Sequence, residues 1–77
     1  MQLGTHIKSR RENIGLTQKQ LAKEVGVTDV TISRYETGER EPGWWQFLKI
    51  CKVLSMNPMD FMEGEKEWER LNLEDLE

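Results

Sequence analysis

The sequence has one cysteine and one histidine, which leaves few residues for disulfides, metal ligands or nucleophilic catalysis. A single cysteine cannot form an intramolecular disulfide, and Cys51 has apolar neighbours at helical spacing, so we expect a buried thiol. His6 has no partner at a spacing typical of metal ligands, and we expect its ring to face solvent. Because no catalytic carboxylate pair or Ser/His/Asp set is recognisable, the sequence predicts no enzyme, no cofactor and no metal site.

Long apolar segments and an excess of basic residues are also lacking. No run of 18 apolar residues occurs, and the N-terminus has no signal-peptide pattern, so we expect a cytoplasmic protein without a membrane span. The net charge is −3, but residues 1–52 carry nine Lys or Arg and six Asp or Glu, whereas residues 53–77 carry two and eight. Residues 1–52 therefore have a formal charge of +3, and residues 53–77 have a formal charge of −6.

With 77 residues, the chain is long enough for one domain with a small core. We expect this domain to cover residues 1–64, followed by an acidic C-terminal tail over residues 65–77. A domain of this size would gain buried area by forming a homodimer.

Residues 17–38 have the pattern of two short helices joined by a tight turn. We expect one helix over Gln18–Val25 and a second over residues 28–36, each with one apolar stripe. The residues that we expect to begin and end them are Thr17, Gly26, Thr28 and Gly38. The residues that we expect in the core are Leu21, Ala22, Val25, Ile32 and Tyr35. This pattern predicts a helix-turn-helix unit.

The rest of the first 64 residues predicts three more helices, over residues 2–13, over residues 43–54 and after Asn57, with Pro58 in the first position. The apolar residues expected in the core from the first two are Leu3, Ile7, Ile14, Trp44, Phe47, Leu48, Cys51 and Leu54. Leu16 should also pack into the core. Trp45 does not share the helical spacing of the core residues expected in residues 43–54. The prediction is an all-α bundle of five helices.

The stretch from residue 17 to residue 38 resembles the DNA-binding domain of the lambda-type phage repressor and Cro family. The residues that carry this resemblance are Gln18, Ala22, Gly26, Ile32, Tyr35, Glu36 and Gly38. The resemblance extends over roughly residues 3–62. It implies binding to double-stranded DNA through the second helix of the unit, whose first residues would enter the major groove.

By this resemblance, the outward face of the second helix would read base edges. Arg34 could form two hydrogen bonds with guanine, and Val30 could pack against a thymine methyl group. Ser33 could donate or accept, and Asp29 could accept from cytosine. The alternative for Asp29 is a structural role, in which its charge stabilises the positive end of the helix dipole.

Other residues would bind phosphate groups. In the family, the glutamine that opens the first helix of the unit contacts a phosphate, and Gln18 has that position. Thr28 could present its hydroxyl and nearby N–H groups. The basic candidates are Lys19, Arg10 and Arg40, each of which could equally be an ordinary solvated charge. Glu39 and Glu41 flank Arg40 and weaken its case.

Arg11 and Glu36 match an ion pair that repressors of this type often form between the first helix and the end of the base-reading helix. Such a pair would be structural and would hold the second helix of the unit at its angle. The alternative is two exposed charges of little energetic weight.

The sequence favours two functions, which differ in the role of the acidic tail. The main expectation is a transcriptional regulator, a repressor of phage or bacterial type that binds a two-fold operator as a dimer. The alternative is an antitoxin or interaction module that binds a protein partner through residues 65–77. Trp68, Leu71, Leu73 and Leu76 favour docking of the tail, either on its own chain or as a dimer arm, over an outer surface expected to include Ile50, Val53 and Phe61.

Overall fold

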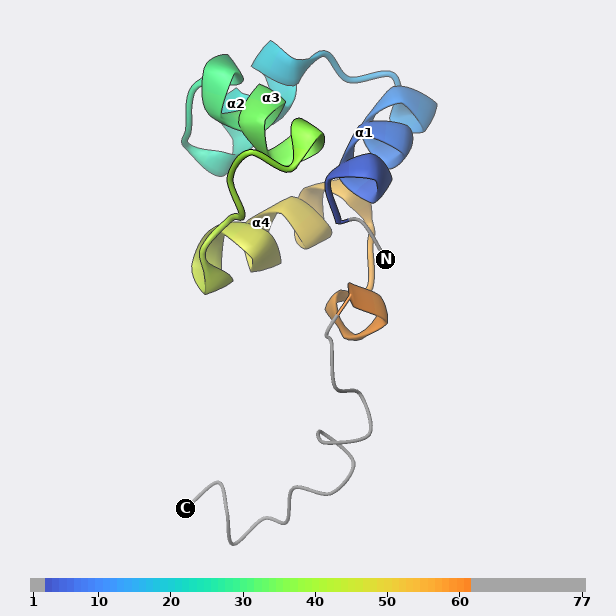
Figure 1. The fold of residues 1–77 in the computed structure, drawn as a ribbon. Helices are drawn as coiled ribbons and strands as arrows, with labels where there is room; N and C mark the ends of the chain where they lie inside the picture. The colour runs from blue at the N-terminus through green and yellow to red at the C-terminus, as the bar shows by residue number, and fades with distance from the viewer. Residues whose placement is uncertain (1–2, 62–77) are drawn as a thin grey trace, which may run out of the picture.

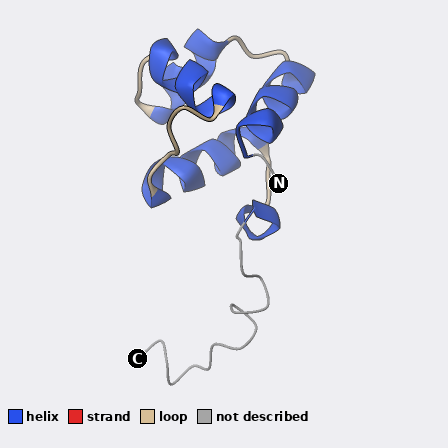
Figure 2. Cartoon of the chain, viewed as in Figure 1, coloured by secondary structure: helices blue, strands red, loops and turns tan. Residues whose placement is uncertain are grey.

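The computed structural model describes residues 3–61, which form four α-helices and one short 3₁₀ helix. The helices are α1 (Leu3–Ile14), α2 (Gln18–Val25), α3 (Asp29–Thr37) and α4 (Trp44–Leu54), followed by the 3₁₀ helix η1 (Pro58–Phe61). Figure 1 shows α2 and α3 together at one end of the domain, with α1 beside them and α4 crossing below. In Figure 2 all regular structure of the described part is helical.

The prediction of five helices is wrong in its last element, because the segment after Asn57 is a single 3₁₀ turn within the described residues. Asn57 does begin this turn, since its side-chain oxygen accepts from the Met59 N–H at 3.0 Å. The expected end at Gly64 and the whole tail, residues 65–77, lie outside the described residues.

Local capping explains the bounds of α2. The Thr17 hydroxyl accepts from the Gln20 N–H at 3.0 Å, and the Gln20 side chain accepts from the Thr17 N–H at 2.8 Å. This reciprocal pair satisfies two N–H groups that an uncapped helix would leave open. At the other end, Gly26 adopts a φ of 77°, which is costly for a residue with a Cβ.

The turn between α2 and α3 leads directly into the cap of α3. The Thr28 hydroxyl accepts from the Thr31 N–H at 3.2 Å, and Gly38 ends the helix with a φ of 83°. The predicted two-helix unit is therefore confirmed, with its glycines and threonines at the expected ends.

The core lies where α1, α2, α3 and α4 meet. Its buried apolar cluster comprises Ile7, Leu21, Ala22, Val25, Ile32, Tyr35, Ile50 and Leu54, with Leu16 partly buried against it. Cys51 is also buried, as predicted, and burial raises the pKa of its thiol. His6 is exposed, as predicted, and its ring meets Phe61 edge-on.

The predicted core face of α4 was partly wrong. Ile50 is fully buried, although the sequence placed it on the outer surface, and Leu48 is only half-buried. Leu48 and Ile50 each have helical spacing with other apolar residues of α4. The position of the neighbouring helices therefore decides which of the two is fully buried. Trp44 is 52% exposed because it begins the helix, where its ring contacts Phe47 at the edge of the core.

The C-terminal end of α1 also differs from the prediction. Ile14 is 43% exposed, although it continues the spacing of Ile7 and Arg11. Gly15 follows with a φ of 90° and reverses the chain, so that Leu16 packs against the core instead.

Gly4 lies at the closest approach between α1 and the end of α3. A Cβ at this position would overlap the carbonyl oxygen of Tyr35 and lie 2.6 Å from that of Glu36. Only a glycine allows α1 to pack this closely against the α3 backbone.

Candidate nucleic-acid interface

The outward face of α3 contains the four residues expected to contact bases. Asp29, Val30 and Arg34 are exposed and Ser33 is half-buried, whereas Ile32 and Tyr35 anchor the opposite face in the core. Val30 is 55% exposed, so its methyl groups are accessible on this face. This face is called the α3 outer face below. No other element of residues 3–61 covers it, so it is accessible to another molecule.

Two residues of the α3 outer face have local partners. The Asp29 carboxylate accepts from the Val30 N–H at 3.0 Å, which supports the structural role at the start of the helix. The Arg34 Nε lies 3.9 Å from a Glu39 carboxylate oxygen, with both side chains more than half exposed. Such an exposed pair contributes little, so Arg34 can leave Glu39 for a stronger acceptor.

Arg11 and Glu36 form the ion pair implied by the resemblance. The Arg11 Nε donates to Glu36 Oε2 at 2.6 Å and Nη2 donates to Oε1 at 3.1 Å, while Nη1 donates to the Leu16 carbonyl at 2.8 Å. Both residues are 8% exposed. Hydrogen bonding to Glu36 is the main cause that raises the pKa of Arg11 further above its ordinary value, so Arg11 keeps its charge at neutral pH.

Gln18 joins this pair to the start of α2. Its side-chain N–H donates to Glu36 Oε1 at 3.0 Å, so Glu36 receives hydrogen bonds from α1 and from α2. Three helices are thus tied together at the end of α3. The sequence did not predict this contact, and no local pattern could have, because the residues lie 18 apart along the chain.

The remaining residues expected to bind phosphate are distributed unevenly. Lys19 is exposed in the first turn of α2, and Arg40 is exposed in the loop after α3. Thr28 is exposed at the start of α3, but its hydroxyl already bonds with Thr31. Lys19 and Arg40 therefore have the fewest competing contacts.

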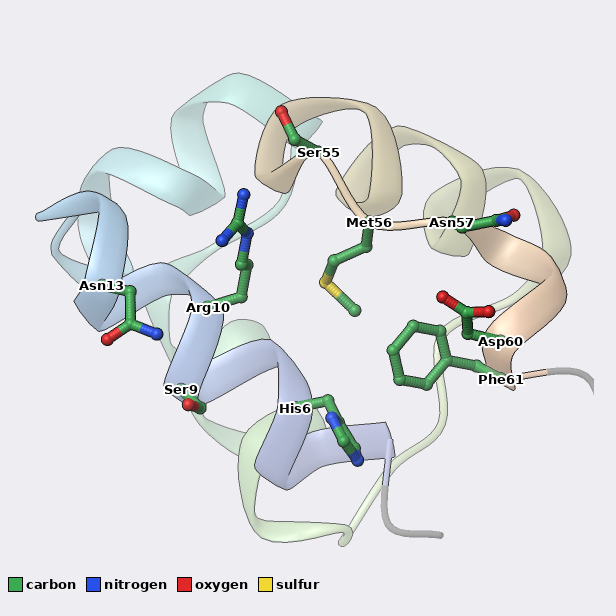
Figure 3. Close-up of a pocket in the computed structure, with 9 residues that line it drawn as sticks. All are labelled: His6, Ser9, Arg10, Asn13, Ser55, Met56, Asn57, Asp60 and Phe61. Carbon is green, nitrogen blue, oxygen red and sulfur yellow. The ribbon is translucent and has the colours of Figure 1, made fainter.

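Arg10 differs from Lys19 and Arg40 because its side chain already has a partner within the domain. Its Nε donates to the carbonyl oxygen of Leu54 at 2.8 Å, at the C-terminal end of α4. Figure 3 shows its side chain directed toward Ser55, in a groove between α1 and the segment that follows α4. This hydrogen bond competes with the predicted phosphate contact of Arg10, which stays a prediction.

Two further features, a metal-binding cluster and a membrane-spanning helix, are absent from the described part of the chain. Residues 3–61 contain no group of three His, Cys, Asp or Glu side chains placed to hold a metal ion. In the same part of the chain, no helix has the length and apolar character needed to cross a bilayer.

Comparison with known proteins identifies relatives of the whole described domain. The helix-turn-helix domain family matches residues 2–60. Repressor protein C2 of Salmonella phage P22 is 35% identical over 63 residues, which cover 82% of this chain and 29% of the relative. Transcriptional regulator DicA of Escherichia coli strain K12 is 32% identical over 65 residues, 84% of this chain and 48% of its own length.

Antitoxin HipB of Escherichia coli O6:H1 is also similar, with 34% identity over 56 residues, 73% of this chain and 60% of the relative. Among solved structures, the P22 c2 repressor in complex with a synthetic operator superposes with a TM-score of 0.77 and 34% identity. That match covers 83% of this chain and 97% of the solved one. The chain spans less than half the length of the P22 and DicA proteins.

Proposed function

The chain belongs to the family of helix-turn-helix domains, and from this premise we propose that it binds DNA in a sequence-specific manner and regulates transcription. The P22 repressor, with which it shares this fold, is solved on an operator. The observation that carries the proposal is the α3 outer face, which leaves Val30 and Arg34 exposed while buried hydrogen bonds hold the helix on α1 and α2.

In this proposal α3 lies in the major groove of DNA. Arg34 forms two hydrogen bonds with a guanine, Val30 contacts a thymine methyl group and Ser33 contacts a neighbouring base edge. Asp29 has the smallest part, because its carboxylate is already used at the helix start. The order of contributions to specificity is therefore Arg34 first and Asp29 last.

Phosphate contacts place α3 in the groove. Lys19 and Arg40 supply positive charge, while Gln18 and Thr28 supply polar groups at the starts of α2 and α3. Gln18 keeps one N–H and its carbonyl oxygen after bonding to Glu36. It can therefore bind a phosphate while it continues to hold the end of α3.

The protein acts as a repressor in the cytoplasm, as a homodimer on a two-fold operator whose half-sites lie about 10 base pairs apart. Residues 1–64 bind DNA, and residues 65–77 do not, since six acidic residues against two basic ones would be repelled by phosphate. Two weak half-site contacts then combine into one specific complex.

Selection of bound sequences from a random DNA pool tests the proposal. The expected result is an enriched sequence with two-fold symmetry that contains a guanine in each half-site. Loss of selectivity in an Arg34→Ala chain, with Lys8→Ala as the control for a lost exposed positive charge on α1, would assign that guanine to Arg34. A pool that shows no enrichment at low salt would overturn the proposal.

The second candidate is an antitoxin, favoured by the similarity to HipB and by the apolar residues of the acidic tail. Such a protein would co-purify with a specific protein partner, and binding of this partner would require residues 65–77. Purification of the chain from its native host, with a Trp68→Ala chain as control, distinguishes this candidate from a regulator that acts alone.

A further inference from the structure

The side of α4 that faces away from the core combines an exposed tryptophan with two lysines. Trp45 is 74% exposed, and Lys49 and Lys52 follow it on the same side of the helix at spacings of four and three residues. Leu48 and Val53 are half-buried at its edges. This surface, called the α4 outer face below, has no partner among the described residues.

The charge of α4 is of one sign. The helix contains two lysines and no acidic residue over Trp44–Leu54. A ligand for the α4 outer face should therefore be acidic and carry apolar side chains that can cover Trp45.

Residues 65–77 have this composition. They contain six acidic residues against Lys66 and Arg70, together with Trp68, Leu71, Leu73 and Leu76. No other stretch of the chain combines so much negative charge with large apolar residues. We propose that residues 65–77 dock on the α4 outer face of their own chain, with Trp68 and Leu71 against Trp45 and the carboxylates near Lys49 and Lys52.

The place where the described chain ends makes this contact reachable. The ring centroids of Phe61 and Phe47 are 6.5 Å apart, so the described chain ends beside the core-facing side of α4. To reach the α4 outer face, the following residues must pass around a helix that is about 10–12 Å across with its side chains. An extended chain spans up to about 3.3–3.6 Å per residue, so the seven residues from Phe61 to Trp68 cover about 23–25 Å. The eleven residues of α4 extend only about 16 Å.

Attachment to the same chain also favours docking on that chain over docking on a second copy. Covalent attachment through a short connection keeps a segment at an effective concentration on the order of millimolar. At micromolar protein, a tail from another molecule competes poorly with it. The outer surface that the sequence predicted for either form of docking included Ile50, and Ile50 is fully buried.

The other recess near the end of the described chain fits the tail less well. The groove of Figure 3 is lined by His6, Arg10, Met56, Asp60 and Phe61, among others. Arg10 already bonds to Leu54, and the Asp60 carboxylate would repel an acidic segment. The α4 outer face has neither disadvantage.

The test uses the full chain labelled with ¹⁵N, in the absence of DNA, so that its outcome is separate from the proposed function. Trp68→Ala combined with Leu71→Ala should shift the Trp45 indole signal and the Lys49 and Lys52 amide signals, while core signals such as Ile50 stay in place. Shifts confined to residues around His6 and Arg10 would place the tail in the groove and overturn the proposal, as would no shift in the described domain.

A charge reversal provides the reciprocal measurement. Lys49→Glu with Lys52→Glu should move the Trp68 indole signal to the position of a solvent-exposed tryptophan. The matched control is Lys8→Glu with Lys23→Glu, which makes the same charge change at exposed positions on α1 and α2. Equal effects of the two pairs on Trp68 would mean that only net charge matters, and the proposed site would be wrong.

A mixing experiment identifies the occupant. The labelled Trp68→Ala, Leu71→Ala chain is mixed with an excess of unlabelled wild-type chain at micromolar concentration. If the tail docks on its own chain, the Trp45 signal of the labelled chain stays shifted. Recovery of the wild-type position would show that the tail of a second copy covers the α4 outer face, contrary to the proposal.

Discussion

At the residue scale, two buried features decide how α1 meets α3. Gly4 brings the backbones together, and Arg11 supplies the charge that Glu36 needs once it is buried. A buried carboxylate without a partner is expensive, whereas one with three hydrogen bonds from Arg11 and Gln18 is satisfied. Both features therefore position α3 through contacts inside the domain.

Removal of the Arg11 charge should destabilise the domain strongly. Arg11→Met leaves Glu36 buried with only Gln18 as a partner, at an expected cost of roughly 3–5 kcal/mol. The double change Arg11→Met, Glu36→Gln should recover part of the loss, as measured by thermal or urea unfolding. Strictly additive losses in this cycle would show that the pair has no coupling energy.

The exposed pair of Arg34 and Glu39 provides the control for that cycle. Its atoms are 3.9 Å apart and both side chains are largely exposed. Glu39→Gln should therefore change the free energy of unfolding by less than about 1 kcal/mol.

A methyl group at position 4 should be poorly tolerated. At an exposed position within a helix, Gly→Ala raises the free energy of unfolding by about 1 kcal/mol. At position 4 the new Cβ would overlap carbonyl groups of α3, so we expect the free energy of unfolding to fall by about 1–3 kcal/mol. Gly43→Ala is the matched control, since its Cβ would have no neighbour within 4 Å. Similar melting temperatures for the wild-type and Gly4→Ala chains would contradict the close packing of α1 on α3.

At the scale of elements, capping sets the helix bounds and the buried network sets their angles. Thr17, Gln20 and Thr28 act within their own turns, so α2 and α3 begin where the sequence predicts. The α3 outer face then extends from Asp29 to Arg34, with its exposed residues on the side opposite the core. In the proposal, Arg34 on α3 reads a base and Lys19 on α2 binds phosphate, so these two contributions are separable by mutation.

Arg34→Ala and Lys19→Ala should have different effects on DNA binding. Without the Arg34 guanidinium, the preference for one base pair per half-site should disappear, at a cost of about 1–3 kcal/mol for each guanine that it binds. Removal of the Lys19 charge should weaken binding to all sequences alike and reduce the salt dependence. Titration of selected and mutated operators by fluorescence anisotropy measures both, and unchanged base preferences in the Arg34→Ala chain would mean that the proposed base-reading residue is wrong.

At the scale of the whole molecule, charge is divided along the chain. Residues 1–52 have a formal charge of +3 and residues 53–77 of −6, so the net charge of −3 conceals a basic N-terminal part. Because this excess is small, affinity for DNA should depend on a few well-placed contacts rather than on a broad positive surface.

Binding to the selected operator should therefore be salt-dependent with a moderate slope. If four to six phosphates are neutralised per dimer, log K should fall with log salt at a slope of about −4 to −5. Anisotropy titrations across a series of salt concentrations measure this slope, with Lys19→Ala expected to make it shallower. A flat response would be incompatible with phosphate contacts from both subunits.

The sequence by itself determined the features that depend on nearby residues. The bounds of α2 and α3 follow from threonine caps and αL glycines, whose hydrogen bonds and φ angles involve only a few neighbours in the chain. The division into core-facing and outward-facing residues of α3 follows from helical spacing for the same reason. The pairing of Arg11 with Glu36 was available only through the family resemblance, which carries information about tertiary structure.

Tertiary structure decided the features that depend on distant segments. Helical spacing permitted either Leu48 or Ile50 in the core, and the position of the neighbouring helices selected Ile50. Arg10 bonds to Leu54, 44 residues away, and Gly4 meets the α3 backbone, so neither interaction has a local signal. Such interactions depend on how the helices pack, which a pattern within one helix does not specify.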